Sequence, residues 1–177
     1  MEAAIIDCPG LALAGHSIAT RKADGDNLRD IPAFWADYAA RLRQPLLDAL
    51  RLPHAAEYGV VYDFDPAGGG FRYLIAIECP DAAALPPGVE RRRLPPARYA
   101  VFTTPPAAGP AEFGQRIAQT WQRIYQDWLP ASADWQHAPG DVFERYDGRC
   151  APGQGRLQMD IYLPIQPKLR QGKPCNT

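Results

Sequence analysis

The chain has 177 residues, of which 46% are hydrophobic and 22% charged, a balance that excludes a wholly disordered or fibrous protein. This length suits one domain, or two small halves that share a core. The formal net charge is only -1, so no overall field attracts the chain to nucleic acid or to an anionic membrane. No apolar stretch approaches the roughly 18 to 20 residues that span a bilayer, and the N-terminus does not resemble a signal peptide. We therefore expect a soluble, cytoplasmic protein with no direct nucleic-acid or membrane binding.

The first half of the chain is predicted to form a strand, a helix and two further strands. An apolar-rich run predicts a strand over 11–20, followed by a polar turn. Asp30 as a possible N-cap and an apolar stripe predict a helix that begins near Pro32. Pro45 should end or kink this helix, with a further short helical turn over 45–50. Strands over 58–64 and 71–79 follow, joined by a loop rich in glycine.

The second half repeats this order. A short strand over 89–94 ends at Pro95-Pro96 and is followed by a strand over 99–104. An apolar stripe at spacings of three and four predicts a helix over 111–129, and strands are expected over 142–149 and 157–163. The halves, about 11–79 and 98–165, predict an α+β domain over 1–166 with an antiparallel sheet, helices on one side and a cleft between the halves. A polar tail covers 167–177.

Two segments of the halves are similar enough to align. The first reads Tyr58-Gly-Val-Val-Tyr-Asp63 and the second Val142-Phe-Glu-Arg-Tyr-Asp147. Matching their Tyr-Asp pairs places Glu144 where the first copy has Val60. A charge in the position of a buried hydrophobe is costly unless something binds it. A second interpretation stays open, in which Glu144 points to water from an edge strand or pairs with a nearby arginine.

Strand alternation places Glu144 on the same face as Val142 and Tyr146. Glu144 is therefore a candidate for the floor of an aromatic cleft, where desolvation would raise its pKa and favour either a bound cation or a role as general base. Aromatic faces would add attraction for a cation. The candidate lining residues, each also explained by ordinary core packing, are Trp121, Tyr125, Tyr99, Phe102, Tyr146 and Tyr162.

Other chemistry has little support in the sequence. The four cysteines are far apart and form no Cys-x-x-Cys motif, and the three histidines are scattered. The run Gly68-Gly69-Gly70 follows a strand but opens no helix, so it is not a phosphate-binding loop. We therefore expect no metal site and no cofactor, with the cysteines reduced.

Several segments, taken together and in order, resemble the bacterial effector-binding domain found in AraC-type regulators and in gyrase-inhibitory-protein-like modules. The resemblance covers roughly residues 11 to 165. The segments that carry it are Ile31-Pro-Ala-Phe-Trp35, Tyr58-Gly-Val-Val-Tyr-Asp63, Leu94-Pro-Pro-Ala-Arg-Tyr-Ala-Val-Phe102, Thr120-Trp121, Ile124-Tyr-Gln-Asp-Trp-Leu-Pro130, Phe143-Glu-Arg-Tyr-Asp147 and Met159-Asp-Ile-Tyr-Leu-Pro-Ile165.

This resemblance implies a duplicated strand-helix-strand-strand fold in which a glutamate like Glu144 binds cationic or lipophilic small molecules among aromatic residues. The chain would then be a standalone small-molecule-binding module, acting as a sensor or a sequestering protein and not as an enzyme. Two alternatives follow from relatives with this fold. One is a hydrolase of reactive small molecules with Glu144 as general base and Trp121 or Tyr146 orienting the substrate. The other is a protein that acts on a partner such as gyrase or a regulator.

Overall fold

One antiparallel sheet organises the chain. The computed structural model describes residues 1–80, 83–151 and 155–168. Within these residues the strand order is β1-β6-β9-β8-β3-β4-β2-β5, with β7 also paired to β9. The strands are β1 (Ala4–Cys8), β2 (Leu11–Arg21), β3 (Glu57–Tyr62), β4 (Gly70–Glu78), β5 (Glu90–Leu94), β6 (Ala97–Thr103), β7 (Trp135–His137), β8 (Val142–Tyr146) and β9 (Asp160–Pro167). Because β3 pairs with β8, the two halves meet in the middle of the sheet.

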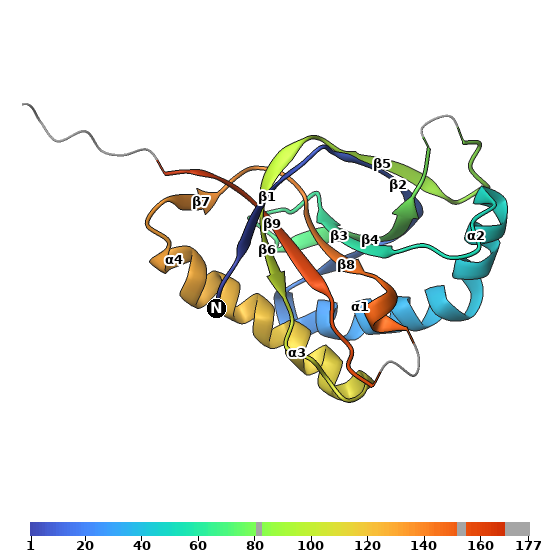
Figure 1. Cartoon of the computed structure of the whole chain (residues 1–177). Helices are drawn as coiled ribbons and strands as arrows, with labels where there is room; N and C mark the ends of the chain where they lie inside the picture. Colours follow the sequence, from blue (N-terminus) through green and yellow to red (C-terminus); the bar gives the residue numbers. More distant parts are fainter. Residues whose placement is uncertain (81–82, 152–154, 169–177) are drawn as a thin grey trace, which may run out of the picture.

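The helices lie together on one side of this sheet (Figure 1). They are α1 (Asp26–Asp37), α2 (Arg43–Leu50), α3 (Pro110–Arg123) and α4 (Leu129–Ala131). A π-helical turn joins the helices of each half, at Tyr38–Leu42 and at Ile124–Trp128. Short 3-10 turns occupy Ala23–Gly25 and Gly148–Cys150. The predicted α+β class, with an antiparallel sheet and helices on one side, is confirmed.

The first helix differs from its prediction at both ends. It begins at Asp26, so Asp30 is an interior residue whose carboxylate accepts a hydrogen bond from the Thr20 hydroxyl at 2.9 Å, and not the N-cap. Pro32 lies within the helix. Pro45 does not end the helical segment: it lies in α2, directly after the π-helical turn at Tyr38–Leu42 that interrupts the α-helical hydrogen-bond pattern.

The strands differ from prediction mainly where they are short or near the sheet's ends. Neither β1 nor β7 is predicted by the sequence, since β1 is a mostly exposed five-residue edge strand and β7 has three residues. The strand predicted over 142–149 ends at Tyr146, where a 3-10 turn follows. The last strand is offset and runs from Asp160 to Pro167, so the predicted tail begins inside it. Residues 169–177 of that tail lie outside the described residues.

The two ends of the sheet are connected by a bent ribbon. Strand β1 pairs with β6 at one end and β2 pairs with β5 at the other, yet only two residues separate β1 from β2 and two separate β5 from β6. The paired strands therefore continue across the molecule and arch over the side opposite the helices (Figure 1). This curvature gives the sheet an inner face with its own core.

Buried side chains form three clusters separated by the sheet. One cluster fills the arch side and includes Tyr58, Val60 and Phe143. A second lies between the first-half helices and β4, and includes Tyr38 and Tyr73. The third lies beneath α3 and includes Phe102. The helical face of the sheet thus has two cores, and the boundary between them follows the β3–β8 pair.

Candidate functional site

Glu144 lies at this boundary, on the central strand β8, and faces the helices. Only 6% of the residue is exposed. Its partner across the β3–β8 pair is Gly59, while Val60 pairs with Phe143 and faces the arch-side core. Val60 and Glu144, which the sequence repeat aligns, therefore face opposite sides of the sheet, and Gly59 is the residue of β3 that faces the helices beside Glu144. The edge-strand alternative is also wrong, because β8 lies between β3 and β9.

Gly59 leaves space that the carboxylate and a tyrosine use. A Cβ atom at this position would lie 2.1 Å from the Tyr73 hydroxyl oxygen and 2.8 Å from Oε2 of Glu144. Both distances are far below an ordinary van der Waals contact. A residue with no side chain is thus required where the tyrosine reaches across β3 to the glutamate.

Three neutral groups donate hydrogen bonds to the Glu144 carboxylate. The indole Nε1 of Trp121 donates to Oε1 at 2.7 Å. The hydroxyls of Tyr73 and Tyr146 donate to Oε2 at 2.7 and 2.9 Å. The Tyr73 oxygen in turn accepts a hydrogen bond from Nε1 of Trp35 at 3.0 Å. These five side chains, from both helical segments and from β4 and β8, are the Glu144 network.

The two tryptophans of the network occupy corresponding places in the two halves. Trp35 precedes the π-helical turn at Tyr38 by three residues, and Trp121 precedes the one at Ile124 by three. Such turns widen a helix locally and occur frequently at functional sites. The ring of Trp35 also packs against Tyr146, with centroids 4.7 Å apart. Both halves thus contribute an indole to the network, Trp121 by a direct hydrogen bond to Glu144 and Trp35 through Tyr73.

Burial controls the protonation of the network. Desolvation raises the pKa of Glu144, and the hydrogen bonds from Trp121, Tyr73 and Tyr146 offset only part of that rise. Burial and the adjacent Glu144 carboxylate raise the pKa values of Tyr73 and Tyr146 well above the ordinary tyrosine value, so both hydroxyls stay protonated as donors. The site therefore holds one carboxylate whose ionised form is poorly solvated.

No lysine, arginine or histidine pairs with Glu144 among the described residues, which distinguishes it from the other buried acid. Asp160 is 8% exposed, and it accepts hydrogen bonds from the Arg149 guanidinium and from the Thr103 hydroxyl. An internal cation thus compensates the charge of Asp160. The charge of Glu144 is compensated only by neutral dipoles, so the predicted alternative of a pairing arginine is wrong for Glu144.

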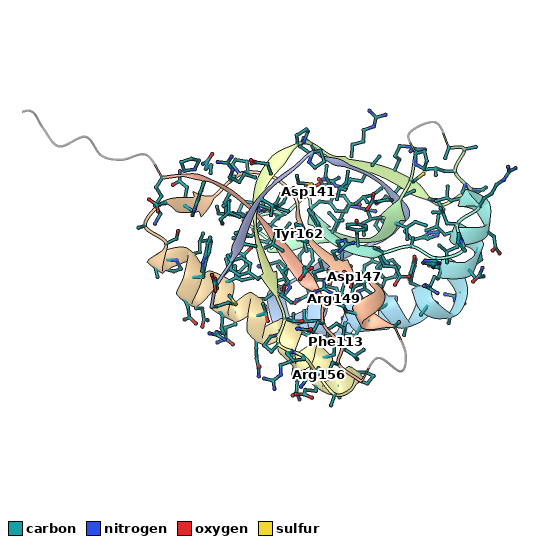
Figure 2. All side chains as sticks on the ribbon, in the orientation of Figure 1. Phe113, Asp141, Asp147, Arg149, Arg156 and Tyr162 are labelled. Atoms are coloured by element: carbon teal, nitrogen blue, oxygen red, sulfur yellow. The ribbon has the colours of Figure 1, made fainter. Side chains whose placement is uncertain are left out.

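The remaining predicted lining residues are divided among three places. Tyr125 stacks on Trp121, with centroids 6.0 Å apart and planes inclined by 13°, and it is 42% exposed. Tyr99 and Tyr162 belong to the arch-side cluster, across the sheet from Glu144. Figure 2 shows Tyr162 on the arch side and Phe113 on the helical side. Phe102 faces the helices but is fully buried against Trp128. The structure thus brings Trp121 and Tyr146, with Tyr125 beside them, to Glu144.

Three residues of the site, Trp35, Tyr73 and Gly59, are not among the site residues predicted from the sequence. The apolar stripe of the first helix contains Trp35, which indicates core but gives no partner for the indole N–H. Tyr73 belongs to an ordinary buried strand. Only the observed register shows that Gly59 lies opposite Glu144. The corresponding positions of Trp35 and Trp121 in the two halves are the sequence feature that could have identified Trp35 as a site residue.

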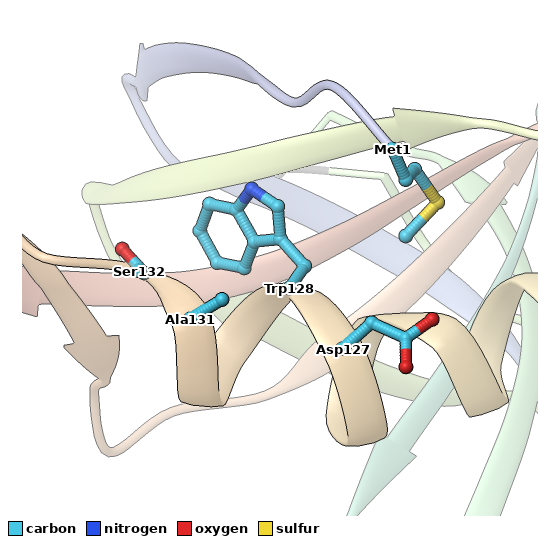
Figure 3. A pocket seen from close by; sticks show the side chains of 5 residues that line it. All are labelled: Met1, Asp127, Trp128, Ala131 and Ser132. Atoms are coloured by element: carbon cyan, nitrogen blue, oxygen red, sulfur yellow. The ribbon is translucent and has the colours of Figure 1, made fainter.

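A separate pocket of about 300 Å³ lies beside the N-terminus (Figure 3). It is lined by Met1, Asp127, Trp128, Ala131 and Ser132. None of these residues belongs to the Glu144 network. Among residues 1–80, 83–151 and 155–168, no group of three or more potential ligands could hold a metal ion. The same residues include no helix long and apolar enough to cross a membrane.

Solved structures share this fold at low sequence identity. SAV2435, solved with tetraphenylphosphonium bound, has a TM-score of 0.72 at 18% identity over 94% of this chain and 94% of that chain. The integron cassette protein VCH_CASS2 of Vibrio cholerae has a TM-score of 0.67 at 16% identity, covering 93% and 96%. The EcmrR C-terminal domain has a TM-score of 0.58 at 12% identity, covering 93% and 97%. No curated protein matches the chain.

The family of the chain is evident from its sequence as a whole. The model of Cass2, described as integron-associated effector binding protein, matches residues 4–165. This span includes every strand and helix from β1 to β8 and most of β9. The resemblance to effector-binding domains is confirmed. The chain belongs to the Cass2 family of integron-associated effector binding proteins.

Proposed function

We propose that the protein binds a lipophilic cation at Glu144 and acts as a sensor or sequestering module for such compounds. The observation that carries the proposal is a buried carboxylate that has three neutral donors and no cationic partner among the described residues. A bound cation would supply the missing counter-charge, and the loss of water around Glu144 strengthens that attraction.

The aromatic side chains around Glu144 suit a large cation with delocalised charge. The indole of Trp121 and the ring of Tyr146 flank the carboxylate, and Tyr125 extends the aromatic surface from Trp121 toward solvent. Each favourable contact between a cation and a ring contributes about 0.5 to 2 kcal/mol, depending on solvent exposure. A small, strongly hydrated ion gains little from such walls, so lipophilic cations should be preferred.

Because Glu144 is only 6% exposed, ligand entry requires movement of side chains of the network, and the two indoles are the candidates. Trp35 and Trp121 are each half-buried, and each lies one turn before a π-helical segment. Rotation of an indole would expose Glu144 and exchange a neutral hydrogen bond for a charged partner. Support for this class of ligand also comes from SAV2435, a protein of the same fold that was solved with tetraphenylphosphonium. EcmrR, whose C-terminal domain has this fold, was solved in a complex with DNA and supports the sensor role.

Thermal unfolding with tetraphenylphosphonium tests the proposal, with uncharged triphenylphosphine oxide as the matched compound. A ligand present at 100 times its dissociation constant stabilises the folded state by about 2.7 kcal/mol. In a chain of this size that free energy raises Tm by about 5 to 10 °C. We expect the phosphonium to produce this rise and the oxide to produce little. Equal shifts with both compounds, or none with either, would show that Glu144 does not act as a counter-charge.

A further inference from the structure

A buried hydroxyl near the Glu144 network has no hydrogen-bond partner. Tyr38, at the start of the first π-helical turn, is 0% exposed, and its hydroxyl oxygen neither donates nor accepts a hydrogen bond in the described part of the chain. An unsatisfied polar group in a protein core is costly, so each instance calls for a physical reason. A hydroxyl that interacts with a ligand in another state of the protein is one such reason.

The Tyr38 hydroxyl lies within the electrostatic influence of a second carboxylate. Burial raises the pKa of Tyr38, the negative charge of Glu57 raises it further, and the positive charge of Arg43 lowers it. Arg43 Nε donates to Oε1 of Glu57 at 2.6 Å. The side chain of Glu57 is 19% exposed and that of Arg43 is 41% exposed. The outer partner of this ion pair can therefore turn into water.

Glu57 and Glu144 lie on the same face of the sheet as diagonal neighbours. Glu57 pairs with Tyr146, and Gly59 pairs with Glu144. Diagonal neighbours of this kind are about 7 to 8 Å apart. The ring of Trp35 packs against Tyr146, the partner of Glu57 across the strand pair, and against Tyr38, with centroids 4.7 and 5.9 Å apart. Movement of Trp35 would therefore change the surroundings of Tyr38 and of the Glu144 network together.

We propose that Tyr38 and Glu57 form a second polar subsite beside the proposed Glu144 site, one that receives a protonated amine carried by the cation bound at Glu144. This inference rests on the proposed function. The amine N–H groups would donate to the Tyr38 oxygen and to Glu57, while Arg43 turns to solvent. The preferred ligand is then an aromatic dication with one diffuse charge and one hydrogen-bonding charge, separated by about the distance between diagonal sheet neighbours.

A matched pair of phosphonium ions tests this specificity. Benzyltriphenylphosphonium carries the diffuse charge alone, and its para-aminomethyl derivative adds an ammonium group across one phenyl ring. Titration calorimetry at pH 7 should give the wild type about a tenfold preference for the amine, the size expected for hydrogen bonds to a charged group. We expect Tyr38→Phe and Glu57→Gln each to lose most of this preference.

Tyr58→Phe serves as the control, because it removes a tyrosine hydroxyl as Tyr38→Phe does. Tyr58 follows Glu57 in β3 but lies on the arch side of the sheet. It should retain the tenfold preference. Equal affinity of the two compounds for the wild type would overturn the subsite and leave the proposed function intact. Retention of the preference in both Tyr38→Phe and Glu57→Gln would do the same. Failure of both compounds to bind the wild type would overturn the proposed function and the subsite with it.

Discussion

Glu144→Gln is expected to raise the thermal stability of the protein at pH 8. Burial raises the pKa of Glu144, so the folded state holds the proton more tightly than the unfolded chain does. This stabilisation is fully present below the pKa that Glu144 has in the unfolded chain. It is lost as pH rises through the pKa that Glu144 has in the folded protein. A glutamine stays neutral throughout and can still accept the Trp121 hydrogen bond, while its amide donates to the tyrosine oxygens; the hydroxyl hydrogens that lose their acceptor reduce this gain in stability.

Thermal unfolding of both proteins between pH 4 and pH 8 measures this effect. The Tm difference should be smallest at pH 4 and should grow as pH rises, by about 2 to 4 °C for each kcal/mol that the ionised carboxylate costs. Asp160→Asn is the matched control: it removes one of the two carboxylates that pair with Arg149, the other being Asp147, and should lower Tm at pH 8. If Glu144→Gln lowered Tm at pH 8 as Asp160→Asn does, the ionised Glu144 would be a stabilising structural group.

Gly59→Ala is expected to be among the most destabilising single-methyl additions in the sheet. The new Cβ would lie 2.1 Å from the Tyr73 oxygen and 2.8 Å from Glu144 Oε2, so the Tyr73 hydroxyl must move and its hydrogen bond to the carboxylate must break. Overpacking costs about 1 to 3 kcal/mol, and an unsatisfied buried group costs a further 1 to 3 kcal/mol or so. We expect a loss of about 2 to 6 kcal/mol in the free energy of unfolding, measured by urea denaturation.

Gly114→Ala is the control for the alanine substitution itself. Gly114 lies in α3 with no atom within 4 Å of the added Cβ, and alanine is the better helix former. This change should stabilise the protein by about 0.5 to 1 kcal/mol. A loss below about 0.5 kcal/mol for Gly59→Ala would mean that Tyr73 has room to move, and that Gly59 does not determine the geometry of the network.

The sequence predicts the helices and the long strands because their signals are local. The apolar stripe containing Trp121 spans the whole second helical segment and identifies the face that packs on the sheet. Alternation along β8 likewise places Glu144 and Tyr146 on one face, and both do share that face. The prediction is weaker at β1, where five mostly exposed residues form an edge strand with no clear pattern.

The arrangement around Glu144 depends on contacts between residues that are distant in sequence, which is why it was only partly predicted. Tyr73 and Glu144 are 71 residues apart, and Trp35 and Tyr73 are 38 apart. The alignment of the two halves gives Val60 and Glu144 the same face, whereas Val60 lies in the arch-side cluster and Glu144 faces the helices. A one-residue difference reverses the face of a strand. The repeat therefore identifies the unusual residue but not its neighbours.

Titration of tetraphenylphosphonium into the wild type and into Glu144→Gln, repeated across the pH range, tests the central claim most directly. For the wild type we expect Kd to fall as pH rises through the folded pKa of Glu144, because the ionised carboxylate is the form that attracts the cation. The variant should bind at least about 30-fold more weakly at pH 8, as expected when one charge of a buried pair is removed. The affinity of the variant should not change over the pH range in which Glu144 ionises in the wild type. Equal affinities of the two proteins at every pH would contradict the role of Glu144 as the counter-charge.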